Sequence, residues 1–210
     1  MTAQQGASGE GAGVPAGRAS PYEVVALAAS AGGVTALRRV LGDLPSDLAI
    51  PVLVVQHLDR RHRTVLAEVI GRYSALPVKL AQDQEVARAG AVYVAPPDHH
   101  LLAGSDGVLT LTRTELVHFV RPSADLLFES VAGAYGADVI ACVLTGTGSD
   151  GAMGVSAVKA RGGTVIVEDP ATAEFRGMPQ AALDADDADF VLPLDEIGQL
   201  IGRIARVGRS

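Results

Sequence analysis

Residues 139–161 read VIACVLTGTGSDGAMGVSAVKAR. Val139–Thr145 is a continuous apolar run rather than an alternating one, which is typical of a strand buried on both faces of a parallel sheet. The glycine-rich residues 146–151 follow at once, and Ala152–Arg161 then has the pattern of a helix. This order of strand, tight loop and helix is the repeating unit of α/β proteins with parallel sheets.

The same alternation of apolar runs and helical segments extends in both directions from this unit. Further strands are expected at Val24–Ala28, Pro51–Gln56, Ala91–Ala95, Thr164–Val167 and Phe190–Leu192. Further helices are expected at Val34–Leu41, Thr64–Arg72, Ser123–Tyr135, Pro179–Asp184 and Asp195–Arg206, and a hairpin at His99–Thr112. We therefore predict an α/β fold: a doubly wound, mostly parallel sheet with helices on both faces and a β-hairpin insertion.

Composition limits the domain organisation and the partners. Residues 1–20 contain almost no large apolar side chain, so we expect a disordered N-terminal tail there and a single domain over residues 21–207. The net charge of −7 argues against nucleic acid and anionic membranes as partners. No apolar run is long enough to span a bilayer, and no secretion signal is recognisable, so we expect a cytoplasmic protein without membrane insertion.

The sequence offers little for metal binding. Cys142 is the only cysteine, which excludes an internal disulfide and a thiolate metal cluster, and it lies in an expected buried strand where a thiol is unreactive. The pairs His57/His62 and His99/His100 lack a convincing third ligand. We therefore expect no metal site from these residues.

A serine stands at the end of the first expected strand. The loop reads Ala28-Ala29-Ser30-Ala31-Gly32-Gly33, and its small-x-Ser-x-Gly spacing resembles a nucleophile elbow. The backbone N–H groups at the following helix start are then candidate oxyanion donors, namely those of Ala31, Gly32 and Gly33. The same pattern also fits a serine that only caps the helix, or a phosphate-binding turn.

Two more reactive side chains follow other expected strands. His57 ends the strand Pro51–Gln56 and is either polar surface or a general base, whose ordinary pKa of about 6.5 suits neutral pH. Asp150 lies in the glycine-rich loop, where the start of the next helix would help keep it ionised. Because ligands bind at the carboxyl ends of parallel strands, Ser30, His57 and Asp150 are expected at one edge, as in a serine-hydrolase triad.

The glycine-rich loop has competing interpretations. Gly146, Gly148 and Gly151 fit G-x-G-x-x-G, and Glu168 follows Gly148 by about 20 residues, as in a dinucleotide-binding fingerprint. Asp150 opposes this, because its carboxylate would repel a pyrophosphate at the helix N-terminus. A plain helix cap is a third interpretation. Under the triad hypothesis, the N–H groups of Thr147 and Gly148 are a second candidate oxyanion hole.

Six collinear segments resemble the catalytic domain of the chemotaxis protein-glutamate methylesterase (CheB) family. The resemblance runs from about Tyr22 to Ala205. The segments are LAASAGG (27–33), VVQHL (54–58), YVAPPDHHL (93–101), RPSADLLFESVA (121–132), LTGTGSDGAMG (144–154) and FRGMPQAAL (175–183). Several motifs in the right order are far more specific than any one of them alone.

The resemblance implies hydrolysis of glutamate γ-methyl esters on the cytoplasmic helices of methylated chemoreceptors, or on another methylated protein, without cofactor or metal. Some family members also deamidate glutamine. By motif position Ser30 matches the nucleophile, His57 the base and Asp150 the orienting acid. A catalytically inactive adaptor with the same fold is a further alternative.

Some features depart from the family pattern. Ala31 stands where the family usually has threonine, Thr147 where it has methionine, and Val120 where histidine precedes the Arg-Pro-Ser segment. Arg121 either lines a substrate groove or belongs to the helix entry at Ser123. The family also usually carries an N-terminal receiver domain, for which twenty residues are too few. We therefore expect a stand-alone member or an excised catalytic domain.

Overall fold

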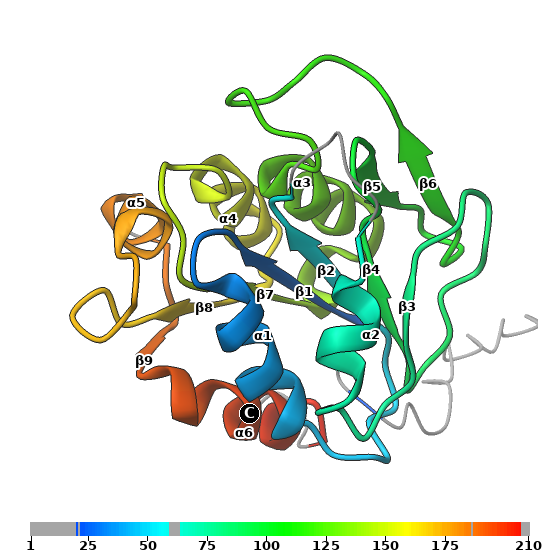
Figure 1. Ribbon diagram of the computed structural model, residues 1–210, viewed down its shortest axis with the longest axis horizontal. Coiled ribbons are helices and arrows are strands. Elements are labelled where there is room, and N and C mark those ends of the chain that lie inside the picture. The colour runs from blue at the N-terminus through cyan, green and yellow to red at the C-terminus, as the bar shows by residue number, and fades with distance from the viewer. Residues whose placement is uncertain (1–19, 21, 59–63, 186, 207–210) are drawn as a thin grey trace, which may run out of the picture.

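A seven-stranded parallel sheet forms the centre of the molecule (Figure 1). The computed structural model describes residue 20 and residues 22–58, 64–185 and 187–206. The strand order is β3-β4-β2-β1-β7-β8-β9, and every neighbouring pair is parallel. The strands are β1 (Val24–Ala29), β2 (Val52–Gln56), β3 (Val78–Leu80), β4 (Val92–Val94), β7 (Val139–Val143), β8 (Thr164–Glu168) and β9 (Phe190–Leu192).

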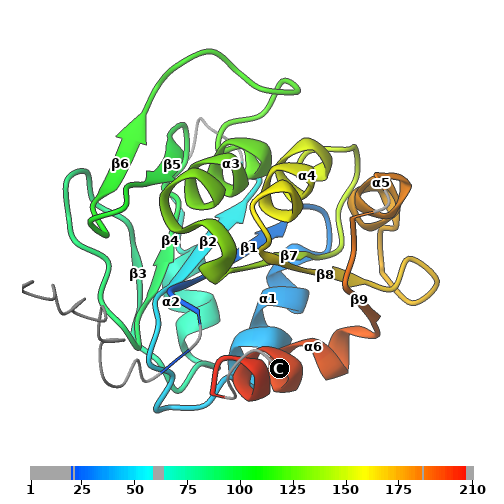
Figure 2. The same ribbon diagram turned by 180° about the vertical axis from the view of Figure 1, so that it is seen from behind.

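Helices cover both faces of the sheet, as predicted. Figures 1 and 2 show α1 and α2 on one face and α3 and α4 on the opposite face. The helices are α1 (Gly33–Gly42), α2 (Leu66–Gly71), α3 (Ala124–Tyr135), α4 (Ala152–Ala160), α5 (Gly177–Asp184) and α6 (Leu194–Ile204), with a 3₁₀ turn at Gly136–Asp138. No helix in the described ranges is long and apolar enough to cross a membrane.

Strand β1 explains why the apolar runs are continuous. All six of its residues are buried, and alternate side chains enter two different cores. Val25 and Leu27 pack with side chains of α1, α2 and α6, whereas Val24 and Ala26 pack with those of α3, α4 and α5. A strand between two helical layers needs apolar residues at every position, because neither face meets water.

The predicted hairpin is also present. Strands β5 (His100–Ala103) and β6 (Leu109–Thr112) pair antiparallel, apart from the main sheet. The hairpin packs on α3, where Ala103 N–H donates to Ser130 Oγ at 3.2 Å. The edge strand β3 was not predicted, since it has only three residues and none of them is fully buried.

Most predicted helix boundaries differ by one or two residues from the observed ones. The expected tail, residues 1–20, lies outside the described residues except for Ser20. Cys142 is completely buried in β7, and burial raises the pKa of its thiol. The thiol therefore stays protonated and unreactive.

Helices α3 and α4 approach each other closely at Gly154. A Cβ on Gly154 would lie 2.6 Å from Phe128 Cβ and 3.0 Å from Asp125 Cα. We predict that Gly154→Ala lowers the free energy of unfolding by about 1–3 kcal/mol, measured by urea denaturation, because the helices must separate. Gly133→Ala is the control, since a Cβ there meets nothing within 4 Å and should stabilise α3 by about 0.5–1 kcal/mol. Equal effects of the two substitutions would contradict this packing account.

Candidate active site

Three neighbouring strands bring Ser30, His57 and Asp150 to one edge of the sheet. Strand β1 pairs with β2 on one side and with β7 on the other. Ser30 and His57 directly follow β1 and β2, and Asp150 lies between β7 and α4. Backbone hydrogen bonds continue the sheet into this edge, from Ser30 N–H to Thr145 O (3.0 Å) and from His57 N–H to Ala29 O (3.1 Å). The prediction that these three residues share one edge is therefore correct.

The Asp150 carboxylate is almost fully buried and has four hydrogen-bond donors. Its Oδ2 accepts from His57 Nε2 at 2.8 Å and from Ala124 N–H at 2.6 Å. Its Oδ1 accepts from Ser123 Oγ–H at 2.8 Å and from Asp125 N–H at 3.1 Å. Burial tends to raise the pKa of Asp150, but the hydrogen bonds from His57, Ala124 and Asp125 outweigh it and the pKa is lowered. The carboxylate is therefore ionised at neutral pH.

The helix that stabilises Asp150 is not the one expected from the sequence. Ala124 and Asp125 are the first residues of α3, and Ser123 is its N-cap. The N-terminus of α4 instead binds a different carboxylate: Asp125 Oδ1 accepts from the N–H groups of Gly151 (2.9 Å) and Gly154 (2.8 Å). The start of α3 therefore binds Asp150, which comes from the loop before α4. The start of α4 binds Asp125, which comes from α3. One signal of this exchange between α3 and α4 is visible in the sequence: a serine cap is followed by an acid in the first turn of α3.

The orientation of His57 determines which nitrogen is available as a base. Nε2 is bonded to Asp150, so an Nε2–H donor leaves Nδ1 unprotonated and free to accept a proton. The His57 side chain is only 12% exposed. Within the described residues, no hydrogen bond joins Ser30 Oγ to the His57 ring.

Gln56 links the backbones of the two candidate residues beside it. Its Nε2 donates to Ser30 O at 2.8 Å and to His57 O at 3.0 Å. The side chain is 4% exposed, and its Oε1 has no partner within the described residues. A Cβ on Gly33 would lie 2.0 Å from this Oε1, which explains the glycine. From the sequence, Gln56 is expected only as the end of a strand, although an amide that closes an apolar run is a usable signal.

The turn after Ser30 limits which N–H groups are free. Gly32 is the N-cap of α1 with φ 75°, a left-handed conformation that favours glycine. Gly33 N–H donates to Ser30 O at 2.9 Å, so this predicted oxyanion donor is already engaged. Ala31 and Gly32 N–H have no hydrogen-bond partner among the described residues, and neither do Thr147 and Gly148 N–H. For these four residues the predicted role stays a prediction.

Residues 175–179 lie against the glycine-rich loop. Gly146 N–H donates to Phe175 O and Met178 N–H donates to Gly146 O, each at 2.9 Å. A Cβ on Gly146 would lie 2.3 Å from Met178 Sδ and 2.9 Å from Ser30 Cβ. The loop, this segment and Ser30 therefore form one packed unit.

The dinucleotide alternative has no support in this geometry. The N-terminus of α4, where a pyrophosphate would bind, already holds the Asp125 carboxylate. Glu168, the expected ribose ligand, is 2% exposed and accepts from Thr145 N–H at 2.7 Å. Neither part of the fingerprint is available to a nucleotide.

The guanidinium of Arg121 is occupied by contacts within the protein. Its Nη2 lies 2.6 Å from Asp98 Oδ1, and its Nη1 donates to the carbonyls of Arg113 and Thr114. Arg121 therefore joins the segment at Asp98 to the segment at residues 113–114. Its predicted contact with substrate stays a prediction. His99 and His100 contact the Pro97 and Glu115 carbonyls respectively, and His62 lies outside the described residues.

The comparison with protein families gives a direct match. The model of the family described as CheB methylesterase matches residues 25–201. The chain belongs to the CheB methylesterase family. The resemblance inferred from the six motifs is thereby confirmed.

Individual relatives agree with this membership. The chain is 38% identical, over 183 residues, to a putative protein-glutamate methylesterase/protein-glutamine glutaminase of Leptospira interrogans, and the match covers 87% of this chain and 95% of that protein. A Paramagnetospirillum magneticum protein of the same description, without "putative", is 43% identical, and the match covers 88% of this chain and 50% of that longer protein. The crystal structure of the Thermotoga maritima CheB methylesterase catalytic domain superposes with a TM-score of 0.83 at 35% identity, covering 87% of this chain and 98% of that one.

We predict that Gln56→Glu lowers kcat for methyl-ester hydrolysis by about 10–100-fold, because a carboxylate would face two carbonyls and shift Ser30 relative to His57. The assay is steady-state methanol release, with Tm measured to confirm folding. Gln199→Glu, at an exposed glutamine of α6, is the matched control. An unchanged kcat in folded Gln56→Glu would show that this amide does not align the site.

Glu168 is a buried acid next to the candidate active site. Burial raises the pKa of its carboxyl, and the charge of Glu174 adds to the rise. The ionised form therefore destabilises the folded state above this raised pKa. Glu168→Gln keeps an acceptor for Thr145 N–H and removes the charge, so we expect a Tm higher by about 2–4 °C at pH 8.

This gain in Tm should shrink as the pH falls through the raised pKa, since the wild-type carboxyl then becomes protonated. Thermal unfolding followed by circular dichroism from pH 4 to 8 measures it, with the exposed Glu115→Gln as control. A gain independent of pH, or a lower Tm at pH 8, would contradict the assignment of Glu168 as a buried, penalised charge.

Proposed function

We propose that this chain is a serine hydrolase that removes methyl groups from glutamate γ-methyl esters on a protein. The observation that carries the proposal is the 2.8 Å contact between His57 Nε2 and Asp150 Oδ2, at the strand edge that also bears Ser30. Membership of the CheB methylesterase family supports the same reaction.

The proposed reaction has two halves. The Ser30 hydroxyl attacks the ester carbonyl while His57 Nδ1 takes its proton, and the buried Asp150 carboxylate stabilises the resulting imidazolium. The tetrahedral intermediate collapses, His57 returns the proton to the leaving oxygen, and methanol departs from a glutamyl–Ser30 ester. Water then attacks this ester with His57 again as base, which releases the glutamate carboxylate and restores the serine. The mechanism requires no metal or cofactor.

The negative charge on the oxygen of the tetrahedral intermediate has to be stabilised by hydrogen-bond donors. The N–H groups of Ala31 and Gly32 are candidates, as are those of Thr147 and Gly148, because they are not used within the described part of the chain. Gly33 is withdrawn from this group, since its N–H donates to Ser30 O. Such donors typically lower the barrier by about 3–4 kcal/mol each.

The substrate is proposed from the relatives. Proteins of Leptospira interrogans and Paramagnetospirillum magneticum are described as protein-glutamate methylesterase/protein-glutamine glutaminase, the former as putative. We infer that this chain acts in the cytoplasm on methylated chemoreceptor helices or a similar methylated protein, with glutamine deamidation as a second activity. The catalytic unit is proposed to be residues 21–207. Ala31, Thr147 and Val120, which depart from the family pattern, are the positions proposed to tune substrate choice.

The test uses the whole chain and a methylated chemoreceptor cytoplasmic fragment. Wild type should release methanol, and Ser30→Ala should lower kcat at least about a thousandfold, because the nucleophile is lost. Asp150→Asn should lower kcat by about 10³–10⁴-fold, because His57 loses the charge that orients it. Both variants should bind the fragment as wild type does.

Two outcomes would overturn the proposal. Methanol release by Ser30→Ala at close to the wild-type rate would exclude Ser30 as nucleophile. Binding of the methylated fragment by wild type without any methanol release would favour the inactive adaptor of the same fold.

A further inference from the structure

A tight turn that the proposed mechanism does not use lies beside Asp150. Val117 and Val120 pair across it, with N–H···O bonds in both directions (3.3 and 2.9 Å). The two residues between them, His118 and Phe119, have φ values of 48° and 64°. Such values at two successive non-glycine residues are unfavourable and persist only when other contacts hold the turn.

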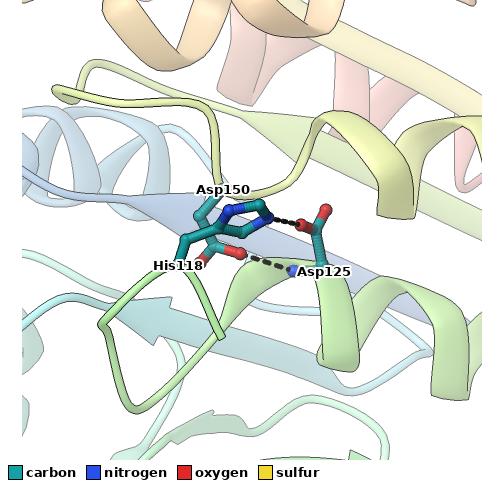
Figure 3. Close-up of side chains that lie close together, drawn as sticks. All are labelled: His118, Asp125 and Asp150. Atoms are coloured by element: carbon teal, nitrogen blue, oxygen red, sulfur yellow. Dashed lines mark hydrogen bonds and ion pairs between the residues drawn. The ribbon is translucent and has the colours of Figure 1, made fainter. Parts of the chain in front are cut away.

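His118 joins this turn to a buried acid. Its Nε2 lies 3.1 Å from Asp125 Oδ2, and Figure 3 shows the His118 ring directed at the Asp125 carboxylate beside Asp150. Phe119, by contrast, is 91% exposed. The turn therefore directs one side chain toward the buried acids and the other into solvent.

Asp125 is the link between His118 and the triad. One of its oxygens binds the N–H groups of Gly151 and Gly154 at the start of α4, which fixes the end of the loop that carries Asp150. Its other oxygen has His118 as its side-chain partner among the described residues. Its own N–H donates to Asp150 Oδ1. Any shift of Asp125 is therefore transmitted to Asp150 from two directions.

The charges around Asp125 make its position sensitive to His118. Burial raises the pKa of Asp125, and the Asp150 charge raises it further, while the N–H groups of Gly154 and Gly151 and then His118 oppose the rise. Other titratable groups at this place among the described residues are His57, bonded to Asp150, and Glu129, whose pKa is raised by burial and by Asp125. His100 also lies close enough to Asp150 for their charges to interact. A protonated Asp125 would accept the α4 N–H groups more weakly.

A metal ion fits this cluster poorly, although the ligand atoms of His118, Asp125 and Asp150 lie within 4.8 Å of one another. Both Asp150 oxygens already accept two hydrogen bonds each. The two carboxylates also lie at the positive ends of α3 and α4, which favour anions over cations. Instead, Asp150 accepts hydrogen bonds at the start of α3 and Asp125 accepts them at the start of α4. His118 contacts Asp125.

We propose that His118 is a positioning residue that holds Asp125 in place and thereby fixes Asp150 against His57. The proposal rests on the proposed hydrolase function for its kinetic consequence, but its structural part concerns Asp125 alone. His118 lies two residues before Val120, the position at which the family resemblance implies a histidine, and its ring reaches Asp125 from the turn.

The first measurement needs no substrate. The side-chain carboxyl ¹³C resonance of Asp125 is followed against pH in wild type and in His118→Ala. We expect the Asp125 titration to move to higher pH in His118→Ala, because the His118 charge that lowers the pKa of Asp125 is lost, while Phe119→Ala leaves it unchanged. An unchanged Asp125 titration in folded His118→Ala would overturn the proposal, whatever the substrate of the enzyme proves to be.

The second measurement is kinetic and uses a conservative rescue. At pH 7.5, His118→Ala should lower kcat about tenfold with KM changed less than about twofold, because Asp150 is misplaced and substrate binding is not. His118→Gln can place an amide donor on Asp125 and should recover most of kcat. Phe119→Ala, in the same turn, should keep the wild-type kcat. Equal losses in the Ala and Gln variants, or a loss confined to KM, would contradict the positioning role.

Discussion

The hydrogen bonding of the Asp150 carboxylate, by four donors from two parts of the chain, is the interaction on which the site depends. His57 supplies one donor, and Ser123, Ala124 and Asp125 at the start of α3 supply the others. A buried carboxylate is costly unless it is fully hydrogen-bonded. The site meets this requirement with backbone N–H groups that α3 would otherwise leave unpaired.

The fold places these groups by joining two helix starts. Asp150 from the loop before α4 caps α3, and Asp125 from α3 caps α4. Gly154 allows the close approach that this exchange needs, since a side chain there would strike Phe128. The packing of α3 against α4 and the position of Asp150 therefore depend on each other, and a change in either is expected to affect the other.

Much of this could be predicted from the sequence, for a physical reason. Continuous apolar runs identify strands buried on both faces, and the residues after such strands must gather at one edge. This reasoning places Ser30, His57 and Asp150 together, and the family motifs agree with it. The short edge strand β3 has no such signal, because its residues are only partly buried.

The remaining features depend on contacts between distant segments, which a single sequence does not reveal. Which helix start would hold Asp150 depends on how α3 and α4 pack. The amide of Gln56 and the ring of His118 acquire their roles only because particular backbone groups lie beside them. The choice of Nδ1 rather than Nε2 as the base likewise follows from the direction in which Asp150 approaches the ring.

The tautomer of His57 tests the central claim most directly, because it depends on the Asp150 contact and on nothing else in the mechanism. Imidazole ¹⁵N NMR of the wild-type chain at pH 8 distinguishes a protonated from an unprotonated ring nitrogen. The account predicts a protonated Nε2 and an unprotonated Nδ1 in wild type, with this preference lost in Asp150→Asn. A wild-type ring protonated at Nδ1, or a tautomer unaffected by Asp150→Asn, would contradict it.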